Sequence, residues 1–340
     1  MNDARIREAL AGAEGWIVGG AVRDERLGRP VVDVDVACRG PREAAMRYSG
    51  LFGGATFPLS EHHGAWRVAA AAASTVDFTP LPDGIEQDLA TRDFTFNAVA
   101  IPVGGDEPVD PHGGLSDLEA GVVRAVSDSV FADDPLRLLR AVRFEDELGF
   151  RMDERTENLV RAHAELAGRP AGERVLAELT RLSADGFRRL EELGLLEPLG
   201  GALDGRVDAL DDPAFRLTAV FGEGLRRLPI SNELGRYAST LLRAHPPEDN
   251  GSRAIHRFRR ATEPWALDAL AFVGRPDLAT AVEESRRREP DEPLVRGDEL
   301  GLPPGPEIGR ILAAIDEERA AGTISTREEA LALARSLGSG

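Results

Sequence analysis

The stretch WIVGGAVRDERLGRPVVDVDV, residues 16–36, constrains the fold of this chain more than any other. Its apolar start ends at a glycine pair, which is the pattern of a strand that breaks into a turn, and the residues that follow can form a short helix. Residues 31–36 then alternate at a period of two, which predicts a strand with Val32, Val34 and Val36 on its buried face. The stretch therefore predicts a strand, a glycine turn, a helix and a second strand in close succession.

The polar residues of this stretch are those that handle phosphate groups. The turn at Gly19 and Gly20 can present backbone N–H groups to a phosphate, and Arg23 adds a planar, permanently charged donor. Asp33 and Asp35 fall on the same face of the second strand, where two carboxylates repel unless a cation lies between them. Hard oxygen ligands suit Mg²⁺. The alternative for each feature alone is an ordinary turn or a solvated strand end, and the combination predicts binding of a nucleoside triphosphate.

Composition limits the chemistry further. All 41 basic residues are arginine, and the absence of lysine excludes a Walker P-loop and Schiff-base catalysis. The single cysteine, Cys38, excludes an internal disulfide and fits a reducing compartment. The first residues lack the apolar core of a signal peptide, and no stretch is long and apolar enough to span a bilayer, so we expect a cytoplasmic protein. A net charge of −18 leaves local arginine clusters as the only route to nucleic-acid binding.

Hydrophobic periodicity divides the chain into a mixed first part and a helical remainder. The expected strands are 16–18, 31–37, 66–73, 75–79, 94–101 and 122–126. The expected later helices are one opening at Asp134 and those at 153–166, 172–184, 186–194, 213–227, 231–244, 251–261, 264–272, 275–287, 306–321 and 325–337. This pattern predicts the α+β class, with a catalytic head of mixed β-sheet followed by all-α parts. The expected domains are a head (1–127), a helical neck (128–200), a helical body (201–290) and a helical tail (291–340).

Two later segments add candidate site residues on the head. Asp77 lies on a predicted strand and is either a third carboxylate of a two-metal site or a solvated strand residue. The row Arg92-Asp93-Phe94-Thr95-Phe96-Asn97 alternates as in a strand with one polar face. Its polar side chains could bind a ribose hydroxyl.

The helix that opens at Asp134-Pro135 carries the third group of candidates. Asp134 and Arg137 are three positions apart and should face the same way, so they offer an acceptor and a donor fork that can mimic a Watson–Crick edge. The alternative is an ordinary ion pair. Arg140 and Arg143 continue the basic side of the helix as candidate phosphate or RNA contacts.

The motifs taken together resemble a known family. In order they are GGAVRD, DVD, TRDFTFNA, DPHGGLSDL, DDPLRLLRAVRF and GERVLAEL, all between residues 15 and 199. They resemble bacterial class II tRNA nucleotidyltransferases and poly(A) polymerases, and the region from Leu294 to Ala334 resembles the C-terminal region of that family. The resemblance implies a head of the nucleotidyltransferase (polymerase β-like) superfamily, followed by a neck, a body and a tRNA-binding tail.

The resemblance also implies a role for each matching residue. Asp33 and Asp35 would bind the metal, with Asp77 as a possible third ligand or base, and Gly19, Gly20 and Arg23 would bind the triphosphate. Arg92, Asp93 and Asn97 would recognise the ribose. The base would be read by Asp134 and Arg137, and this pair would be braced by Glu173 and Arg174. The pair Thr91-Arg92 stands where two successive arginines are usual, and Asp133 stands where glutamate is usual.

The implied reaction is Mg²⁺-dependent, template-independent addition of C, as CC or CCA, to the 3′ end of tRNA from CTP and ATP. The segment FTPLPDGIEQDLAT is short where CCA-adding members carry a longer loop, which favours a CC-adding enzyme. No histidine is followed by aspartate, so we expect no phosphohydrolase site. We expect no membrane and no protein partner. The alternatives are a poly(A) polymerase and, with the D-x-D pair intact, a less favoured inactive RNA-binding relative.

Overall fold

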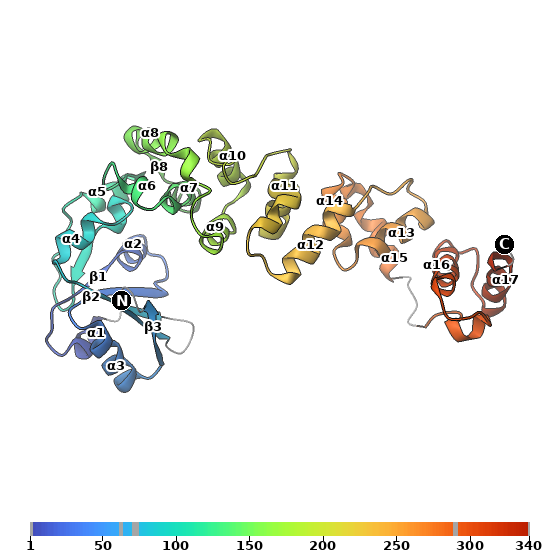
Figure 1. The fold of residues 1–340 in the computed structure, drawn as a ribbon, viewed down its shortest axis with the longest axis horizontal. Coiled ribbons are helices and arrows are strands. Elements are labelled where there is room, and N and C mark those ends of the chain that lie inside the picture. Colours follow the sequence, from blue (N-terminus) through green and yellow to red (C-terminus); the bar gives the residue numbers. More distant parts are fainter. Residues whose placement is uncertain (1–2, 61–63, 70–74, 288–291, 339–340) are drawn as a thin grey trace. The chain divides into compact units, whose positions relative to one another are not determined.

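A computed structural model describes residues 3–60, 64–69, 75–287 and 292–338 of the chain (Figure 1). The chain divides into two compact units, Met1–Leu199 and Gly200–Gly340. Within the described residues, no helix combines the length and the apolar character that crossing a membrane requires. The finer division into four domains stays a prediction.

The first unit is built on a mixed sheet of six strands. Their bounds are β1 (Gly15–Val18), β2 (Asp33–Cys38), β3 (Ala55–Ser60), β4 (Ala65–Ala69), β5 (Thr75–Pro80) and β6 (Ala100–Pro102). The spatial order is β3-β4-β5-β2-β1-β6. The β2–β5 pair is parallel, and the remaining neighbours are antiparallel. This mixed sheet with a helical remainder confirms the expected α+β class.

One face of the sheet is apolar and covered by helices. Side chains of Ile17, Val36, Val76 and Phe78 pack there with α1 (Asp3–Leu10) and α3 (Pro41–Phe52), whose Tyr48 ring lies 6.0 Å from the Phe78 ring. Burial of this face is the main source of stability for the sheet. The period of two then directs the intervening side chains of β2 and β5 to the opposite face.

The other helices of the first unit lie between the strands of the sheet or follow the sheet in the sequence. They are α2 (Gly20–Arg26), α4 (Ile85–Ala90), α5 (Gly114–Ala120), α6 (Val130–Asp133), α7 (Leu136–Leu148), α8 (Glu154–Ala162), α9 (Gly172–Leu179) and α10 (Ala184–Glu192). A second small sheet pairs β7 (Val122–Val123) with β8 (Arg151–Met152). The side chains of Asp153 and Ser183 cap the N-termini of α8 and α10.

The described part of the second unit is helical. Its α-helices are α11 (Pro213–Phe221), α12 (Asn232–Arg243), α13 (Ser252–Thr262), α14 (Ala266–Phe272), α15 (Ala279–Arg287), α16 (Pro306–Ala320) and α17 (Arg327–Leu337). They form two apolar clusters, one around Phe215, Leu241 and Leu270 and one around Ile311 and Ile315. These helices lie within a few residues of the expected ranges.

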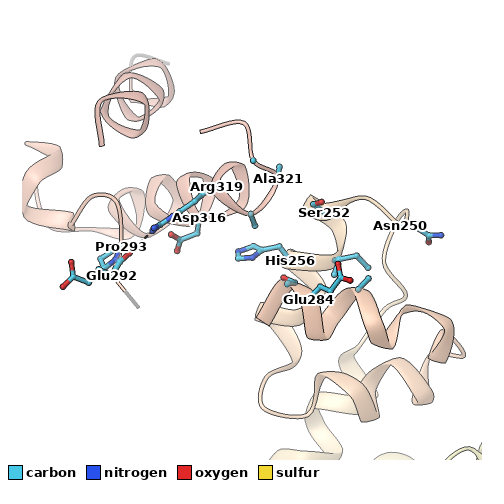
Figure 2. Close-up of a pocket in the computed structure, with 14 residues that line it drawn as sticks. Asn250, Ser252, His256, Glu284, Glu292, Pro293, Asp316, Arg319 and Ala321 are labelled. Carbon is cyan, nitrogen blue, oxygen red and sulfur yellow. Dashed lines mark hydrogen bonds between the residues drawn. The ribbon is translucent and has the colours of Figure 1, made fainter. Parts of the chain in front are cut away.

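A cavity of about 590 Å³ lies in the second unit, between α13, α15 and α16 (Figure 2). Its lining is largely polar and includes His256, Glu284, Asp316 and Arg319. The Nη1 group of Arg319 donates to the carbonyl oxygen of Glu292 at 2.8 Å and thereby ties α16 to the segment before it.

The expectation of a strand over 94–101 is wrong for its first half. Thr95–Asn97 form a 3₁₀ turn, here η2, and β6 begins only at Ala100. The Asp93 carboxylate accepts hydrogen bonds from the Phe94 amide and the Asn97 side chain, and such local bonds compete with a strand ladder. The polar side chains of this segment are buried and satisfied internally, so its alternation did not mark a solvated face.

Three smaller differences concern the sheet. Strand β3 was not expected from the sequence, and Val32, expected on the buried face, precedes β2 and is 51% exposed. The expected strand over 66–73 is present as β4 up to Ala69, and its last residues lie outside the described residues.

An aromatic cluster joins η2 to α7 and gives a first prediction. Phe96 is 1% exposed, and its ring lies 5.1 Å from that of Phe144, edge to face. Phe96→Ala should lower the free energy of unfolding by about 3–5 kcal/mol, because it leaves a cavity in a packed core. Urea unfolding followed by circular dichroism measures this. Met46→Ala, at a position 50% exposed on α3, is the control and should change the value by less than about 0.5 kcal/mol.

Candidate functional site

The sheet brings three of the expected carboxylates to one face. In the parallel β2–β5 pair, Asp35 is in register with Asp77, and Asp33 is in register with Thr75. Residues in register point to the same face of a sheet, and Asp33 and Asp35 share a face because they are two positions apart. The Thr75 hydroxyl donates to Asp33 Oδ1 at 2.6 Å and orients that carboxylate. The two aspartates therefore lie together on the face opposite the one that α1 and α3 cover.

Asp77 is held by an arginine that the sequence did not reveal. Arg67 on β4 is in register with Asp77, and its Nε and Nη2 groups each donate to a different carboxylate oxygen at 2.7 Å. The Asp77 side chain is only 9% exposed, so it is not a solvated strand residue. Both of its oxygens are engaged by Arg67 in this structure. No cluster of three or more metal-ligating side chains occurs in the described ranges.

A hard divalent cation fits the remaining pair of carboxylates. Burial raises the pKa of Asp35; the charge of Arg92 opposes this, while the negative charges of Asp77 and Asp33 add to it. A cation between Asp33 and Asp35 would relieve that repulsion and favour the ionised form. The donor set, oxygen only, is the one that Mg²⁺ prefers.

The glycine turn lies directly beside this pair. Gly19 has a φ of +70°, and a Cβ at this position would lie 2.7 Å from Arg92 Nη1 and 3.5 Å from Asp35 Oδ2. A side chain at this position would therefore be strained and would displace the guanidinium. Arg92 is oriented by Asp88 of α4, which accepts from its Nε and Nη2 groups at 3.0 and 2.9 Å. The turn, Arg92 and Asp35 thus converge, and Asp88 is a positioning residue that the sequence analysis did not single out.

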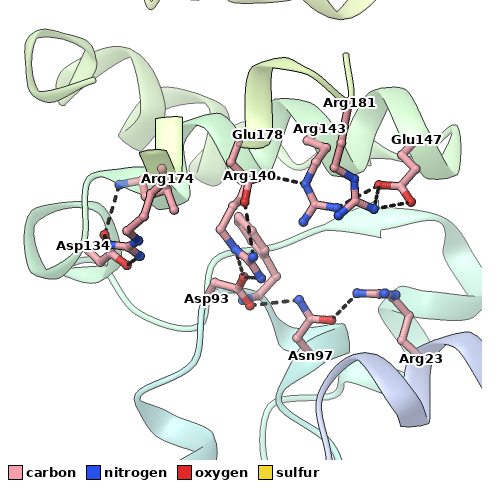
Figure 3. Close-up of polar contacts among 12 residues, drawn as sticks. Arg23, Asp93, Asn97, Asp134, Arg140, Arg143, Glu147, Arg174, Glu178 and Arg181 are labelled. Atoms are coloured by element: carbon pink, nitrogen blue, oxygen red, sulfur yellow. Dashed lines mark hydrogen bonds and ion pairs between the residues drawn. The ribbon is translucent and has the colours of Figure 1, made fainter. Parts of the chain in front are cut away.

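Arg23 and Asn97 extend the site along α2 and η2 (Figure 3). Arg23 Nη1 donates to Asn97 Oδ1 at 2.9 Å, and the guanidinium also pairs with Asp24 at 2.9 Å. Its charge lies 5.1 Å from the Phe144 ring centroid, on the aromatic cluster. Arg23 is therefore fixed by three contacts, and its side chain is 13% exposed.

Asp93 is the centre of a polar network that links the sheet region to the helices (Figure 3). Its carboxylate accepts from Asn97 Nδ2 at 2.9 Å and from Arg140 Nε and Nη2 at 2.8 and 2.6 Å. Burial alone would raise the pKa of Asp93, but the Arg140 charge and the hydrogen bonds from Asn97, Arg140 and Phe94 outweigh it and lower that pKa. The carboxylate is therefore ionised at neutral pH despite its burial.

The network continues through α7 and α9 as alternating charges. Arg143 pairs with Glu178 at 2.5 Å and with Glu147 at 2.8 Å, and Arg181 also pairs with Glu147 at 2.8 Å. The expectation that Arg143 is a phosphate or RNA contact on the basic side of the helix is wrong, because its side chain is 4% exposed, both of its ion pairs are with carboxylates and its guanidinium lies over the Phe144 ring. Glu178 belongs to the sequence motif GERVLAEL. Glu147 follows Arg143 by four helical positions, and this spacing is the one local feature of the sequence that indicates the Arg143–Glu147 ion pair.

The expected base-reading pair lies at the start of α7. Asp134 is not on the helix but precedes it in an extended conformation, with φ −144° and ψ 98°. Arg174 of α9 donates to its two oxygens at 3.3 and 2.7 Å, and Arg137 Nη2 donates to the Thr91 carbonyl oxygen at 2.7 Å. Arg174 thus braces Asp134, whereas Glu173 lies exposed in the first turn of α9.

The Asp93–Arg140 pair gives a pH-dependent prediction. Because the folded-state pKa of Asp93 lies below the ordinary value of about 3.9, its ionised form contributes stability above that pH, which is lost as the pH falls through the folded-state pKa. Asp93→Asn should lower the free energy of unfolding by about 2 kcal/mol at pH 7, since Arg140 loses one of its two carboxylate partners, keeps Glu178 at 3.5 Å and is 31% exposed.

Urea unfolding at pH 7 and at pH 3 measures both values. The difference between wild type and Asp93→Asn should shrink at the lower pH. Asp185→Asn is the control, because this aspartate pairs with Arg188 at a surface position where its side chain is 88% exposed. A difference of the same size at both pH values would contradict the ionised state of Asp93.

Comparison with known proteins places the chain in a family. The family model for the poly A polymerase head domain matches residues 51–124. The A-adding tRNA nucleotidyltransferase of Deinococcus radiodurans is 35% identical, over 93% of this chain and 94% of that protein. The CC-adding tRNA nucleotidyltransferase of Thermus thermophilus is 31% identical, over 93% of this chain and 92% of that protein.

Solved structures agree on the fold. A Thermotoga maritima CCA-adding enzyme, solved in complex with tRNA, has a TM-score of 0.79 at 21% identity. The match covers 98% of this chain and 94% of that enzyme's chain. A CCA-adding enzyme solved with CTP has a TM-score of 0.78 and also 21% identity. The architecture is therefore that of these enzymes, and the sequence relatives extend over almost the whole chain. The chain belongs to the tRNA nucleotidyltransferase family, whose members are enzymes that generally use a divalent metal ion.

Proposed function

We propose that this enzyme adds cytidine, from CTP, to the 3′ end of tRNA in the cytoplasm, without a nucleic-acid template and with Mg²⁺. The observation that carries the proposal is the convergence of Asp33 and Asp35, on one sheet face, with the glycine turn and Arg92. The names of the relatives that match nearly the whole chain support addition of nucleotides to tRNA over poly(A) synthesis, and one of the two names specifies addition of C.

The reaction forms one bond and breaks another at the α-phosphorus of the nucleotide. The tRNA 3′-hydroxyl attacks this phosphorus and loses its proton, and the bond to the β-phosphate breaks to release pyrophosphate. Asp33 and Asp35 would hold Mg²⁺, which when bound neutralises the phosphate charge and favours the deprotonated hydroxyl. Gly19, Gly20 and Arg23 would bind the triphosphate.

The ribose and the base would be bound by the polar network. Arg92, Asp93 and Asn97 would bind the ribose side of the nucleotide, with Asp93 held in place by Arg140. For the base, Asp134 offers an acceptor and Arg137 a donor. At C4 of a pyrimidine or C6 of a purine, cytosine and adenine carry an amino group that can donate a hydrogen bond to an aspartate, whereas uracil and guanine carry a carbonyl oxygen that an aspartate repels. Arg174 would fix the aspartate in the reading position, with Glu173 beside it on α9.

The number of nucleotides added is the finer part of the proposal. Four residues, 81–84, connect β5 to α4, which leads directly to Arg92, so there is little chain to rearrange between two nucleotides. We therefore propose that addition stops after two cytidines. The A-adding name of the Deinococcus relative makes addition of A to a C-C end the second candidate. The helical neck (128–200) and body (201–290) would support the head, and the tail (291–340) would bind tRNA.

Three tRNA transcripts test the reaction: one that lacks CCA, one that ends in C-C and one that is complete. With Mg²⁺ and with CTP and ATP supplied separately and together, we expect two cytidines on the first and no addition to the others, resolved at single-nucleotide length. Full CCA would overturn the two-cytidine limit, and A on the C-C transcript alone would favour the second candidate. Long A tails would contradict tRNA specificity. Asp33→Ala should abolish transfer with an unchanged circular dichroism spectrum.

Base reading by Arg137 predicts a loss of selectivity. Cytosine N3 is an acceptor for the arginine, whereas uracil N3 carries a hydrogen, so Arg137→Ala should reduce the ratio of kcat/KM for CTP over UTP by about 10-fold. Steady-state kinetics with each nucleotide measures this. Arg188→Ala, an arginine of α10 that pairs with Asp185, is the control and should keep the ratio. An unchanged ratio in the Arg137 variant would refute its role.

A further inference from the structure

Strand β3 presents apolar side chains to solvent at the free edge of the sheet. Phe57 is 42% exposed and Leu59 is 46% exposed. Among the residues that the structure describes, this strand pairs only with β4, so no described strand pairs with its outer edge. Proteins protect such edges with charge, proline or a covering element, and here Pro58 interrupts the ladder while the aromatic ring stays accessible. An exposed aromatic ring on an edge strand is therefore a candidate binding surface.

The register places Phe57 on the same face as the carboxylates. Phe57 is opposite Arg67 in the β3–β4 pair, Arg67 is opposite Asp77 in the β4–β5 pair, and Asp77 is in register with Asp35. These four residues form one row across the sheet. Since neighbouring strands lie about 4.8 Å apart, Phe57 is roughly 14 Å from Asp35. The other face of the sheet is the one that α3 covers.

The two ends of this row differ in what surrounds them. On the β1 side of Asp35 lie the glycine turn, Arg92 and, through Asn97, Arg23. Under the proposed function this is the side that binds the triphosphate. In phosphoryl transfer the attacking and leaving oxygens are roughly in line on opposite sides of the phosphorus. The attacking RNA must therefore reach the α-phosphate from the other side, across β5, β4 and β3.

We propose that Phe57 is a stacking platform for a base in the unpaired 3′ end of the acceptor RNA, with the guanidinium of Arg67 beside it. This inference rests on the proposed function. Arg67 is fixed by Asp77, so its flat group extends the platform toward the carboxylates. Stacking on an aromatic ring tolerates any base, which suits an acceptor end that differs between RNA molecules. It also adds affinity without positive charge, in a chain whose net charge is −18.

Phe57→Ala and Phe57→Trp, in the full chain, test the platform by kinetics. We expect Phe57→Ala to raise the KM for tRNA that lacks CCA by roughly 10-fold and to leave the KM for CTP unchanged, whereas Phe57→Trp should keep both values near wild type. The increase should be similar at low and high salt, because stacking releases no counterions. Met46→Ala is the matched control, since it removes a similarly exposed apolar side chain from α3.

A fluorescent acceptor reports the contact directly. The tRNA would carry 2-aminopurine in its unpaired 3′ end, and its emission falls when the base stacks. Without nucleotide, the wild-type protein should quench the emission at saturation, and Phe57→Ala should quench it markedly less.

Three outcomes would overturn the inference. They are equal quenching by both proteins, an equal loss in the KM for tRNA and for CTP, and a change of oligomeric state in Phe57→Ala by size-exclusion chromatography without a change in RNA binding. Failure of the proposed function would give a different result, because the wild-type protein would then add no nucleotide to tRNA. The quenching experiment needs no nucleotide addition, so it would still report whether the RNA base stacks on the protein.

Discussion

The ion pair between Asp93 and Arg140 is the contact on which the rest of the site depends. Asp93 is 6% exposed, and a carboxylate buried to that degree is strongly destabilising unless it is paired and hydrogen-bonded. Arg140 provides the charge from α7, while Asn97 connects the same carboxylate to Arg23 of α2. One buried carboxylate thus ties together the turn after β1, the turn η2 and the helix that carries Arg137. The spacing of the proposed phosphate, ribose and base sites follows from it.

The sequence predicted those features that depend on local patterns. The apolar alternation of β2, the glycine turn and the helices after Pro135 each have a period or a cap that neighbouring residues define. Strand β3 was missed because its sequence ATFPLS has a proline and no clear alternation. The turn η2 was mistaken for a strand because its alternating polar residues are satisfied partly by local bonds, such as that from the Phe94 amide to Asp93, and partly by distant partners, such as Asp117 for Thr95.

Candidate residues for the site could be selected one by one from the sequence, but their pairing could not. The aspartates, arginines and glycines were identified from motifs, and the structure brings many of them together. Their partners lie far away along the chain: the Arg67–Asp77, Arg143–Glu178 and Arg140–Asp93 contacts span 10, 35 and 47 residues. A single sequence with many arginines and acidic residues offers no rule for choosing among such pairs. Only the fold decides which charges are neutralised and which remain accessible.

The hydrogen bond from Arg137 to the Thr91 carbonyl oxygen makes the protein backbone a competitor of the nucleotide. A carbonyl oxygen is an acceptor of the same kind as those on a base, so the arginine is already satisfied before any nucleotide binds. A matching base exchanges one acceptor for another at little net gain, whereas a base without a suitable acceptor would leave the arginine where it is. Under the proposed base reading, discrimination would then arise from the polar atoms of a wrong base that stay without a partner, and tight binding of the correct base would not be required.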